Sequence, residues 1–167
     1  TSATATDRLN MVFEKAKSGQ PITIAAIGGS ITEGAGGNVM SGVSVSAESL
    51  GVTVNGTTYE NSKYVDRVAN WFASKFENTT VNKVNAGFSG TPSFLGTFRL
   101  EHDVLSHNPD LIIVEFSVND LGNYQLDQGY MLDAYESVIR KSLESGAAVV
   151  AVFTVNNLYY TSTNIGN

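Results

Sequence analysis

Four short runs rich in apolar residues recur along the chain, each followed by glycine or a polar residue. In these runs apolar residues mostly follow one another directly and do not alternate strictly with polar ones. Many of them are β-branched. Such runs are typical of strands covered on both faces in a parallel sheet. We therefore predict strands at residues 22–27, 81–86, 111–116 and 147–155.

The segments between these runs place apolar residues at helical spacing. We predict helices at residues 7–18, 61–76, 91–105 and 130–145. Their ends carry the usual signals, because Asn61 and Thr91 are favourable N-caps and Pro92 suits the first helical position. Gly19 and Gly146 are expected to end the first and last of these helices.

Repeated alternation of strand and helix predicts an α/β protein with three layers, in which helices cover both faces of a parallel sheet. Residues 35–58 interrupt this alternation, because they are rich in Gly, Ser, Val and Asn and lack a helical period. We interpret them as a long excursion with a small hairpin around Asn55 and Gly56.

Three polar, glycine-rich loops follow the first three predicted strands, at residues 28–34, 87–91 and 117–122. Sites in sheets of this kind form beyond the carboxyl ends of the strands. We therefore expect these loops to converge at one edge of the sheet.

Composition narrows the classes of function. The 167 residues suffice for one domain, and 10 basic against 16 acidic residues give a formal charge of −6. This charge argues against binding to nucleic acid or to an anionic membrane. There is no cysteine, and no apolar run approaches the roughly 20 residues of a membrane span. The modest charge and the many Thr, Asn, Ser and Gly residues favour a secreted bacterial protein.

The first loop contains the sequence Gly-Gly-Ser-Ile-Thr at residues 28–32. A serine at a tight strand-to-helix turn can present its hydroxyl as a nucleophile, and its backbone N–H can stabilise an oxyanion. Ser30 can equally be a helix cap in an ordinary glycine turn. The spacing of a phosphate-binding loop is absent.

The second and third loops are ambiguous when each is taken alone. Ser89 is a second possible nucleophile, but Thr91 stands where the GxSxG elbow needs its last glycine. Asn119 can donate its side-chain N–H to an oxyanion, although Asn-Asp is also common in turns.

Together, the order and spacing of the loops resemble the SGNH hydrolases, also called the GDSL-like esterase and lipase family. In that family a Ser, a Gly and an Asn block follow successive strands of a flavodoxin-like sheet. The resemblance spans residues 22–155 and implies that Ser30 is the catalytic nucleophile. It also implies an oxyanion hole formed by the N–H groups of Ser30 and Gly90 and by the Asn119 side chain, with Gly87 as the alternative glycine.

The resemblance implies acyl transfer from an ester to water. We expect a carbohydrate esterase that removes acetyl groups from polysaccharide, so the partner is an acylated carbohydrate or another small ester. A lipase or thioesterase of the same family, or a non-catalytic carbohydrate-binding relic, are the alternatives. We expect no cofactor, metal ion, nucleic acid or membrane partner.

The sequence departs from the family pattern twice. Gly29 replaces the aspartate of the usual Gly-Asp-Ser block, as in a Gly-Gly-Ser-Ile-Thr variant of the family. The C-terminal Asp-x-x-His block is also missing, because His102 and His107 follow Arg99 and Val104 by three residues.

We therefore interpret residues 1–167 as one domain of this type that is incomplete at its C-terminus and inactive alone. About 50 residues are expected to be missing. These would carry the catalytic histidine and aspartate, either on the same chain or on a separate one.

Overall fold

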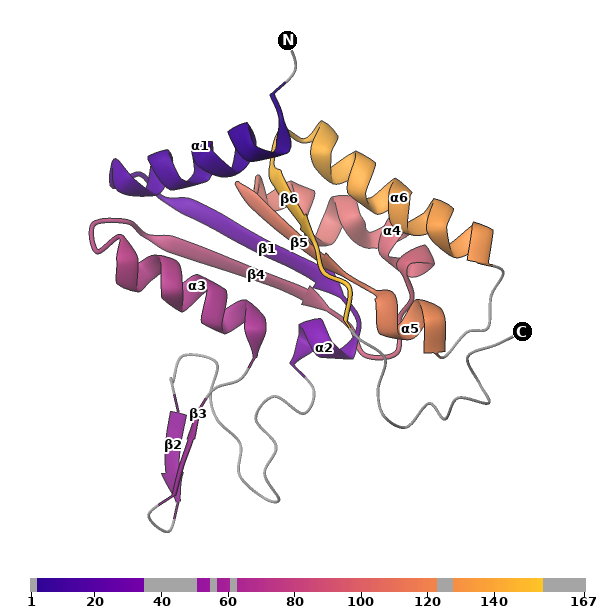
Figure 1. The fold of residues 1–167 in the computed structure, drawn as a ribbon, viewed down its shortest axis with the longest axis horizontal. Helices are drawn as coiled ribbons and strands as arrows, with labels where there is room; N and C mark the ends of the chain where they lie inside the picture. Colours follow the sequence, from indigo (N-terminus) through magenta and orange to yellow (C-terminus); the bar gives the residue numbers. More distant parts are fainter. Residues whose placement is uncertain (1–2, 35–50, 55–56, 61–62, 123–127, 155–167) are drawn as a thin grey trace.

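The computed structural model describes residues 3–34, 51–54, 57–60, 63–122 and 128–154. Its centre is a parallel sheet of four strands in the order β4-β1-β5-β6 (Figure 1). The strands are β1 (Ile22–Gly28), β4 (Val81–Gly87), β5 (Leu111–Glu115) and β6 (Ala148–Ala151). All three neighbouring pairs are parallel, which confirms the predicted sheet.

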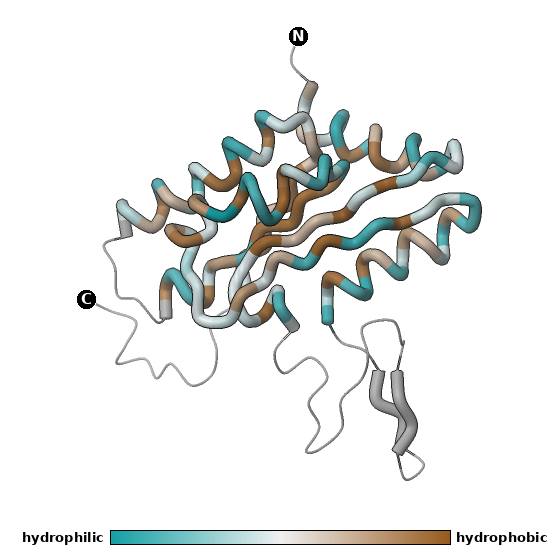
Figure 2. The backbone as a smooth tube through the Cα atoms, turned by 180° about the vertical axis from the view of Figure 1, so that it is seen from behind, coloured by the Kyte–Doolittle hydropathy of each residue, from teal (hydrophilic) through white to brown (hydrophobic). Residues whose placement is uncertain are grey.

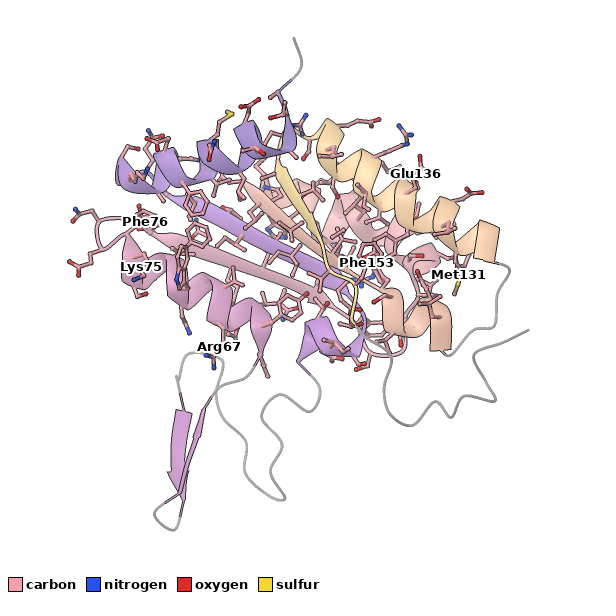
Figure 3. All side chains as sticks on the ribbon, in the orientation of Figure 1. Arg67, Lys75, Phe76, Met131, Glu136 and Phe153 are labelled. Atoms are coloured by element: carbon pink, nitrogen blue, oxygen red, sulfur yellow. The ribbon has the colours of Figure 1, made fainter. Side chains whose placement is uncertain are left out.

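Two helices cover each face of the sheet, so the three-layer α/β/α architecture is confirmed. Helices α1 (Ala5–Lys17) and α3 (Tyr64–Lys75) lie on one face, and α4 (Ser93–Asp103) and α6 (Gln128–Glu144) lie on the other. Apolar positions concentrate in the sheet between these layers (Figure 2). Side chains fill the space between sheet and helices, as Figure 3 shows.

The central strand β1 explains why its sequence reads as a continuous apolar run. Ile24 and Ala26 pack into the core beneath α1 and α3. Ala25 and Ile27 pack into the core beneath α4 and α6. Because successive side chains of a strand point to opposite faces, a strand covered on both sides is apolar at nearly every position, and in β1 the half-buried Thr23 is the exception.

The edge strand β4 differs from this pattern. Its side chains at Asn82, Lys83 and Asn85 are exposed, so the expectation of a buried strand is wrong for this element. Lys83 instead forms an ion pair with the buried carboxylate of Asp66 on α3. The strand has a sheet neighbour on one side only, so polar residues are tolerated along it.

Several predicted helix ends are corrected. Helix α1 begins at Ala5, before the predicted start at Asp7, because Thr4 and Asp7 form a reciprocal capping box. Helix α3 begins at Tyr64 with Lys63 as its N-cap. The predicted cap Asn61 lies outside the described residues.

Helix α4 begins at Ser93, so Pro92 occupies the N-cap position instead of Thr91. The helix ends at Asp103 and is followed by a short 3-10 turn, η1 (Leu105–His107), which replaces the last predicted helical turn. The third predicted loop is itself a short helix, α5 (Ser117–Gly122).

The predicted hairpin is confirmed. Strands β2 (Gly51–Val54) and β3 (Thr57–Glu60) are antiparallel, and Val54 pairs with Thr57 across the two residues between them. The rest of the predicted excursion, residues 35–50, lies outside the described residues.

Candidate active site

The three predicted site loops meet at one edge of the sheet, as expected. Helix α2 (Ser30–Glu33) follows β1, and α5 follows β5 at the same end of the sheet (Figure 1). Gly28 of β1 pairs with Gly87 of β4 on one side and with Glu115 of β5 on the other. The chain segments that carry Ser30, Gly90 and Asn119 therefore leave three adjacent strands side by side.

Ser30 is the first residue of α2 and is partly exposed. Its helix is anchored on the far side by Thr32, whose hydroxyl lies 2.8 Å from the Tyr64 hydroxyl of α3. Burial raises the pKa of Tyr64 to about 12, against a smaller opposing effect of the Thr32 hydrogen bond. The phenol is therefore neutral at ordinary pH and holds α2 through a neutral hydrogen bond.

Gly29 and Asn119 are in very close contact. A Cβ atom built on Gly29 would lie 2.0 Å from the side-chain nitrogen of Asn119. Asn119 is only 3% exposed, and its amide donates a hydrogen bond of 2.9 Å to the Thr91 carbonyl. The amide therefore occupies the space that any side chain at position 29 would need.

The loop after β4 is held by Glu33 of α2. Its carboxylate accepts hydrogen bonds from the backbone N–H of Ser89, at 2.9 Å, and from the Ser89 hydroxyl. The next residue, Gly90, has φ +74, a conformation that side chains other than glycine rarely adopt. Glu33 thus fixes the Ser89 backbone and hydroxyl directly before Gly90.

Gly87 has a packing role that sets it apart from Gly90. A Cβ atom on Gly87 would lie 2.1 Å from the backbone nitrogen of Glu33, so α2 can approach β4 only because position 87 is glycine. The Gly87 N–H donates to the Asn85 side chain at 2.9 Å. This N–H is therefore occupied by a hydrogen bond within the turn.

Asp120, which the sequence analysis did not single out, explains the start of α4. Its carboxylate accepts a hydrogen bond of 2.8 Å from the Ser93 N–H and so supplies the cap that was predicted for Thr91. The Thr91 hydroxyl instead donates to the Phe88 carbonyl at 2.7 Å. The pair Asn119 and Asp120 thus holds the Gly90 loop at two points. The sequence signal for Asp120 is its position directly after Asn119.

Asp120 should make stability depend on pH. Burial raises the pKa of its carboxyl above the ordinary value of 3.8, and hydrogen bonds from Ser93 oppose this shift in part. The folded protein then retains the proton more readily than the unfolded chain. The contribution of Asp120 to the free energy of unfolding is therefore most favourable in acid and falls as pH rises through the raised pKa.

Because asparagine does not titrate, the free energy of unfolding of Asp120→Asn relative to wild type should increase from about pH 4 to about pH 7. Urea denaturation at several pH values measures this difference. A difference that is constant across this range, or that decreases, would contradict the raised pKa.

Arg99 of α4 was also missed by the sequence analysis. One guanidinium nitrogen donates to the Ala86 carbonyl at 2.6 Å and the other to the Gly28 carbonyl at 3.0 Å. Asp103, one turn later, accepts a further bond at 3.2 Å. Arg99 therefore joins the carboxyl ends of β4 and β1. A lone arginine in the apolar first part of α4 was its only sequence signal.

The two histidines of the sequence lie at the end of α4 and in η1, on the segment that leads from β4 to β5. Helix α4 leads from the carboxyl end of β4 back to the amino end of β5, and His102 lies in its last turn. The imidazole of His102 is almost fully exposed and lies 2.8 Å from the Asp103 carboxylate. His107 follows in η1. Both histidines line a groove of about 540 Å³ beside β4 and α4, together with Phe88.

Neither a metal centre nor a membrane-spanning helix is found in the parts of the chain that the structure describes. No three His, Asp or Glu side chains are grouped there so as to hold a metal ion. No helix there combines the length and the hydropathy needed to cross a bilayer.

Comparison with known proteins identifies the family. The model of the GDSL-like lipase/acylhydrolase family matches residues 26–166, which include all three loops of the site. The chain therefore belongs to the GDSL-like lipase/acylhydrolase family. No curated protein sequence gave a match.

Solved structures agree with this assignment. A two-domain esterase active on acetylated mannans is 30% identical, with a TM-score of 0.66 over 87% of this chain and 33% of its own. A structure of the same description, co-crystallised with mannopentaose, is 32% identical with the same TM-score. The chain thus spans about a third of the length of these relatives.

A further structure shares the fold at lower identity. The SGNH-hydrolase family esterase AlinE4 is 21% identical, with a TM-score of 0.55 over 79% of this chain and 58% of its own. This likeness supports the SGNH hydrolase fold.

Proposed function

We propose that this chain forms the nucleophile and oxyanion portion of a serine ester hydrolase. Ser30 is the proposed nucleophile, and the proposed oxyanion donors are the N–H groups of Ser30 and Gly90 and the Asn119 side chain. The observation that carries this proposal is the Asn119 amide, which lies against Gly29 beside the Ser30 backbone. Such preorganised donors stabilise the negative charge that develops on an attacked carbonyl oxygen.

In the proposed reaction a general base takes the Ser30 proton while the serine oxygen attacks the ester carbonyl carbon. The tetrahedral oxyanion collapses, and the alcohol leaves with the proton returned by the base. Water, deprotonated by the same base, then attacks the acyl-enzyme and releases the acid and free Ser30. Because His102 and His107 lie toward the other end of α4, we infer that the base is a histidine of the family's Asp-x-x-His block, which residues 1–167 do not contain.

We propose an acetylated carbohydrate as the substrate. The relatives with 30% and 32% identity are described as active on acetylated mannans, which supports this class. The formal charge of −6 suits a neutral sugar better than an anionic lipid surface. A small acyl group on a sugar therefore fits better than the long acyl chain of a lipase substrate.

The experiment that tests the reaction class is labelling of the full-length protein with a fluorophosphonate, followed by mass spectrometry of the modified peptide. Modification of Ser30 supports the proposal, and a protein that is folded and not labelled would favour a non-catalytic binding role. Acetyl release from acetylated mannan or xylan, compared with hydrolysis of long-chain esters, tests the substrate. Faster hydrolysis of the long-chain esters would favour the lipase alternative.

Replacing Gly29 with alanine should lower ester hydrolysis by about 10- to 100-fold, because the new methyl group would displace the buried Asn119 amide. Turnover of a small acetyl ester by the full-length protein measures this effect. Gly146→Ala is the matched control, because a Cβ atom there meets nothing within 4 Å. That control strains a backbone with φ +91 and should lower stability without lowering turnover. Unchanged turnover in Gly29→Ala would contradict the inferred displacement.

A further inference from the structure

A buried carboxylate lies at the carboxyl end of β5, immediately before α5. Glu115 is 2% exposed and is the only charged residue of this strand. Burying a charged or polar group is costly unless hydrogen bonds compensate for the lost water. Glu115 therefore requires hydrogen-bond donors around its carboxylate. It has no role in the reaction proposed above.

Two hydroxyl groups hold the Glu115 carboxylate. The same carboxylate oxygen, Oε1, accepts hydrogen bonds of 3.0 Å from Ser117 Oγ and from Thr154 Oγ1. These two hydroxyl oxygens are 2.8 Å apart, and the Thr154 N–H donates to Ser117 Oγ at 3.0 Å. The three residues thus form a closed polar network.

This network joins segments that are far apart in the sequence. Ser117 is the first residue of α5, which carries Asn119 two positions later. Thr154 lies in the segment that leaves β6, where the Val152 N–H still donates to the Val114 carbonyl of β5 at 2.8 Å. Phe153, labelled in Figure 3, stacks on Tyr135 of α6 with ring centroids 5.4 Å apart. The Val152 hydrogen bond and the Phe153 ring contact thus connect the segment that carries Thr154 to β5 and α6.

The backbone of Glu115 adds a third connection. Its carbonyl accepts a hydrogen bond of 3.2 Å from the N–H of Gly29, the residue before Ser30. Glu115 thus contacts the loop that carries Ser30 through its backbone. Through its side chain it contacts the start of α5 and the segment that follows β6.

We propose that Glu115 is a positioning residue, whose carboxylate fixes the start of α5 and thereby holds the Asn119 amide beside Ser30. This inference rests on the proposed function, because it assigns Glu115 an effect only through Asn119. A displaced oxyanion donor weakens binding of the transition state more than binding of the substrate. Loss of the carboxylate should therefore lower kcat and leave KM nearly unchanged.

A double-mutant cycle in the full-length protein tests this coupling. Glu115→Ala removes the acceptor of both hydroxyl hydrogen bonds and should lower kcat for a small acetyl ester by about 10- to 100-fold, whereas Glu115→Gln, which keeps an accepting Oε1, should restore most of the activity. In an Asn119→Ala background Glu115→Ala should change kcat by less than about twofold, since the donor that Glu115 positions is already gone. Glu144→Ala makes the same chemical change at the exposed end of α6 and should leave kcat unaltered.

The outcomes separate the two proposals. If the effects of Glu115→Ala and Asn119→Ala multiply, or if Glu115→Ala leaves kcat unchanged while Asn119→Ala lowers it, the positioning role is overturned and the proposed function stands. If Asn119→Ala alone retains full activity, the proposed oxyanion hole fails. Should Glu115→Ala not fold, Thr154→Val removes one hydroxyl of the network, and an effect on kcat that multiplies with that of Asn119→Ala would overturn the positioning role equally.

Discussion

Replacing Ser30 with alanine should lower kcat for ester hydrolysis by the full-length protein by about 10⁴- to 10⁶-fold. Without the hydroxyl no acyl-enzyme can form, whereas the backbone N–H groups and Asn119 remain to bind the ester. KM should therefore change little. The side chain is partly exposed at the start of a short helix, so the melting temperature should be nearly that of wild type. Steady-state kinetics and thermal unfolding measure both effects.

Ser89→Ala provides the matched control for this prediction. Ser89 follows the neighbouring strand β4, and its backbone N–H keeps its hydrogen bond to Glu33 when the hydroxyl is removed. We expect activity to remain within a few-fold of wild type. The opposite pattern, with Ser89→Ala inactive and Ser30→Ala active, would place the nucleophile on the loop after β4 and refute the proposed site.

Replacing Asn119 with alanine should lower turnover by about 100- to 1000-fold, which corresponds to about 2.7–4 kcal/mol of lost transition-state stabilisation. The Thr91 carbonyl also loses the hydrogen bond that Asn119 donates to it. An unsatisfied buried acceptor costs about 1–3 kcal/mol, so the free energy of unfolding should fall as well. Assays well below the melting temperature separate the loss of turnover from the loss of stability.

Asn82→Ala is a suitable control for the Asn119 substitution. Asn82 is exposed on the edge strand β4 and lies near the amino end of that strand, away from Ser30. Its replacement should alter neither turnover nor stability appreciably. Wild-type turnover in Asn119→Ala would remove the amide from the oxyanion hole, even if Ser30 proved essential.

The apolar pattern of the sequence was enough to predict the sheet, because burial on both faces leaves a direct signature. In β1 the consecutive residues Ile24 and Ala25 point into opposite cores, so both positions require an apolar side chain. The hairpin was predictable for a local reason, since Asn-Gly favours a tight turn between strands. Such features depend on a residue and its chain neighbours.

The helix boundaries near the site depended on partners that the sequence does not reveal. Ser93 begins α4 because Asp120, 27 positions later, accepts its N–H. Likewise, the contact of Gly29 with Asn119 arises only after β1 and β5 have paired. The order of the three loops in the sequence was enough to suggest Ser30, Gly90 and Asn119 as site residues. The residues that hold them in place, such as Glu33, Arg99 and Glu115, required the structure.

The bridge that Arg99 makes between β1 and β4 has a consequence for motion. Its planar guanidinium binds one carbonyl from each strand, at Gly28 and at Ala86, so the two strand ends cannot separate without breaking a two-point clamp. The turn that carries Ser30 and the turn that carries Gly90 should therefore fluctuate as one rigid body. In hydrogen-exchange measurements the amides of both turns should exchange slowly and at similar rates. The substrate then binds to a site in which the two turns already hold fixed positions relative to each other.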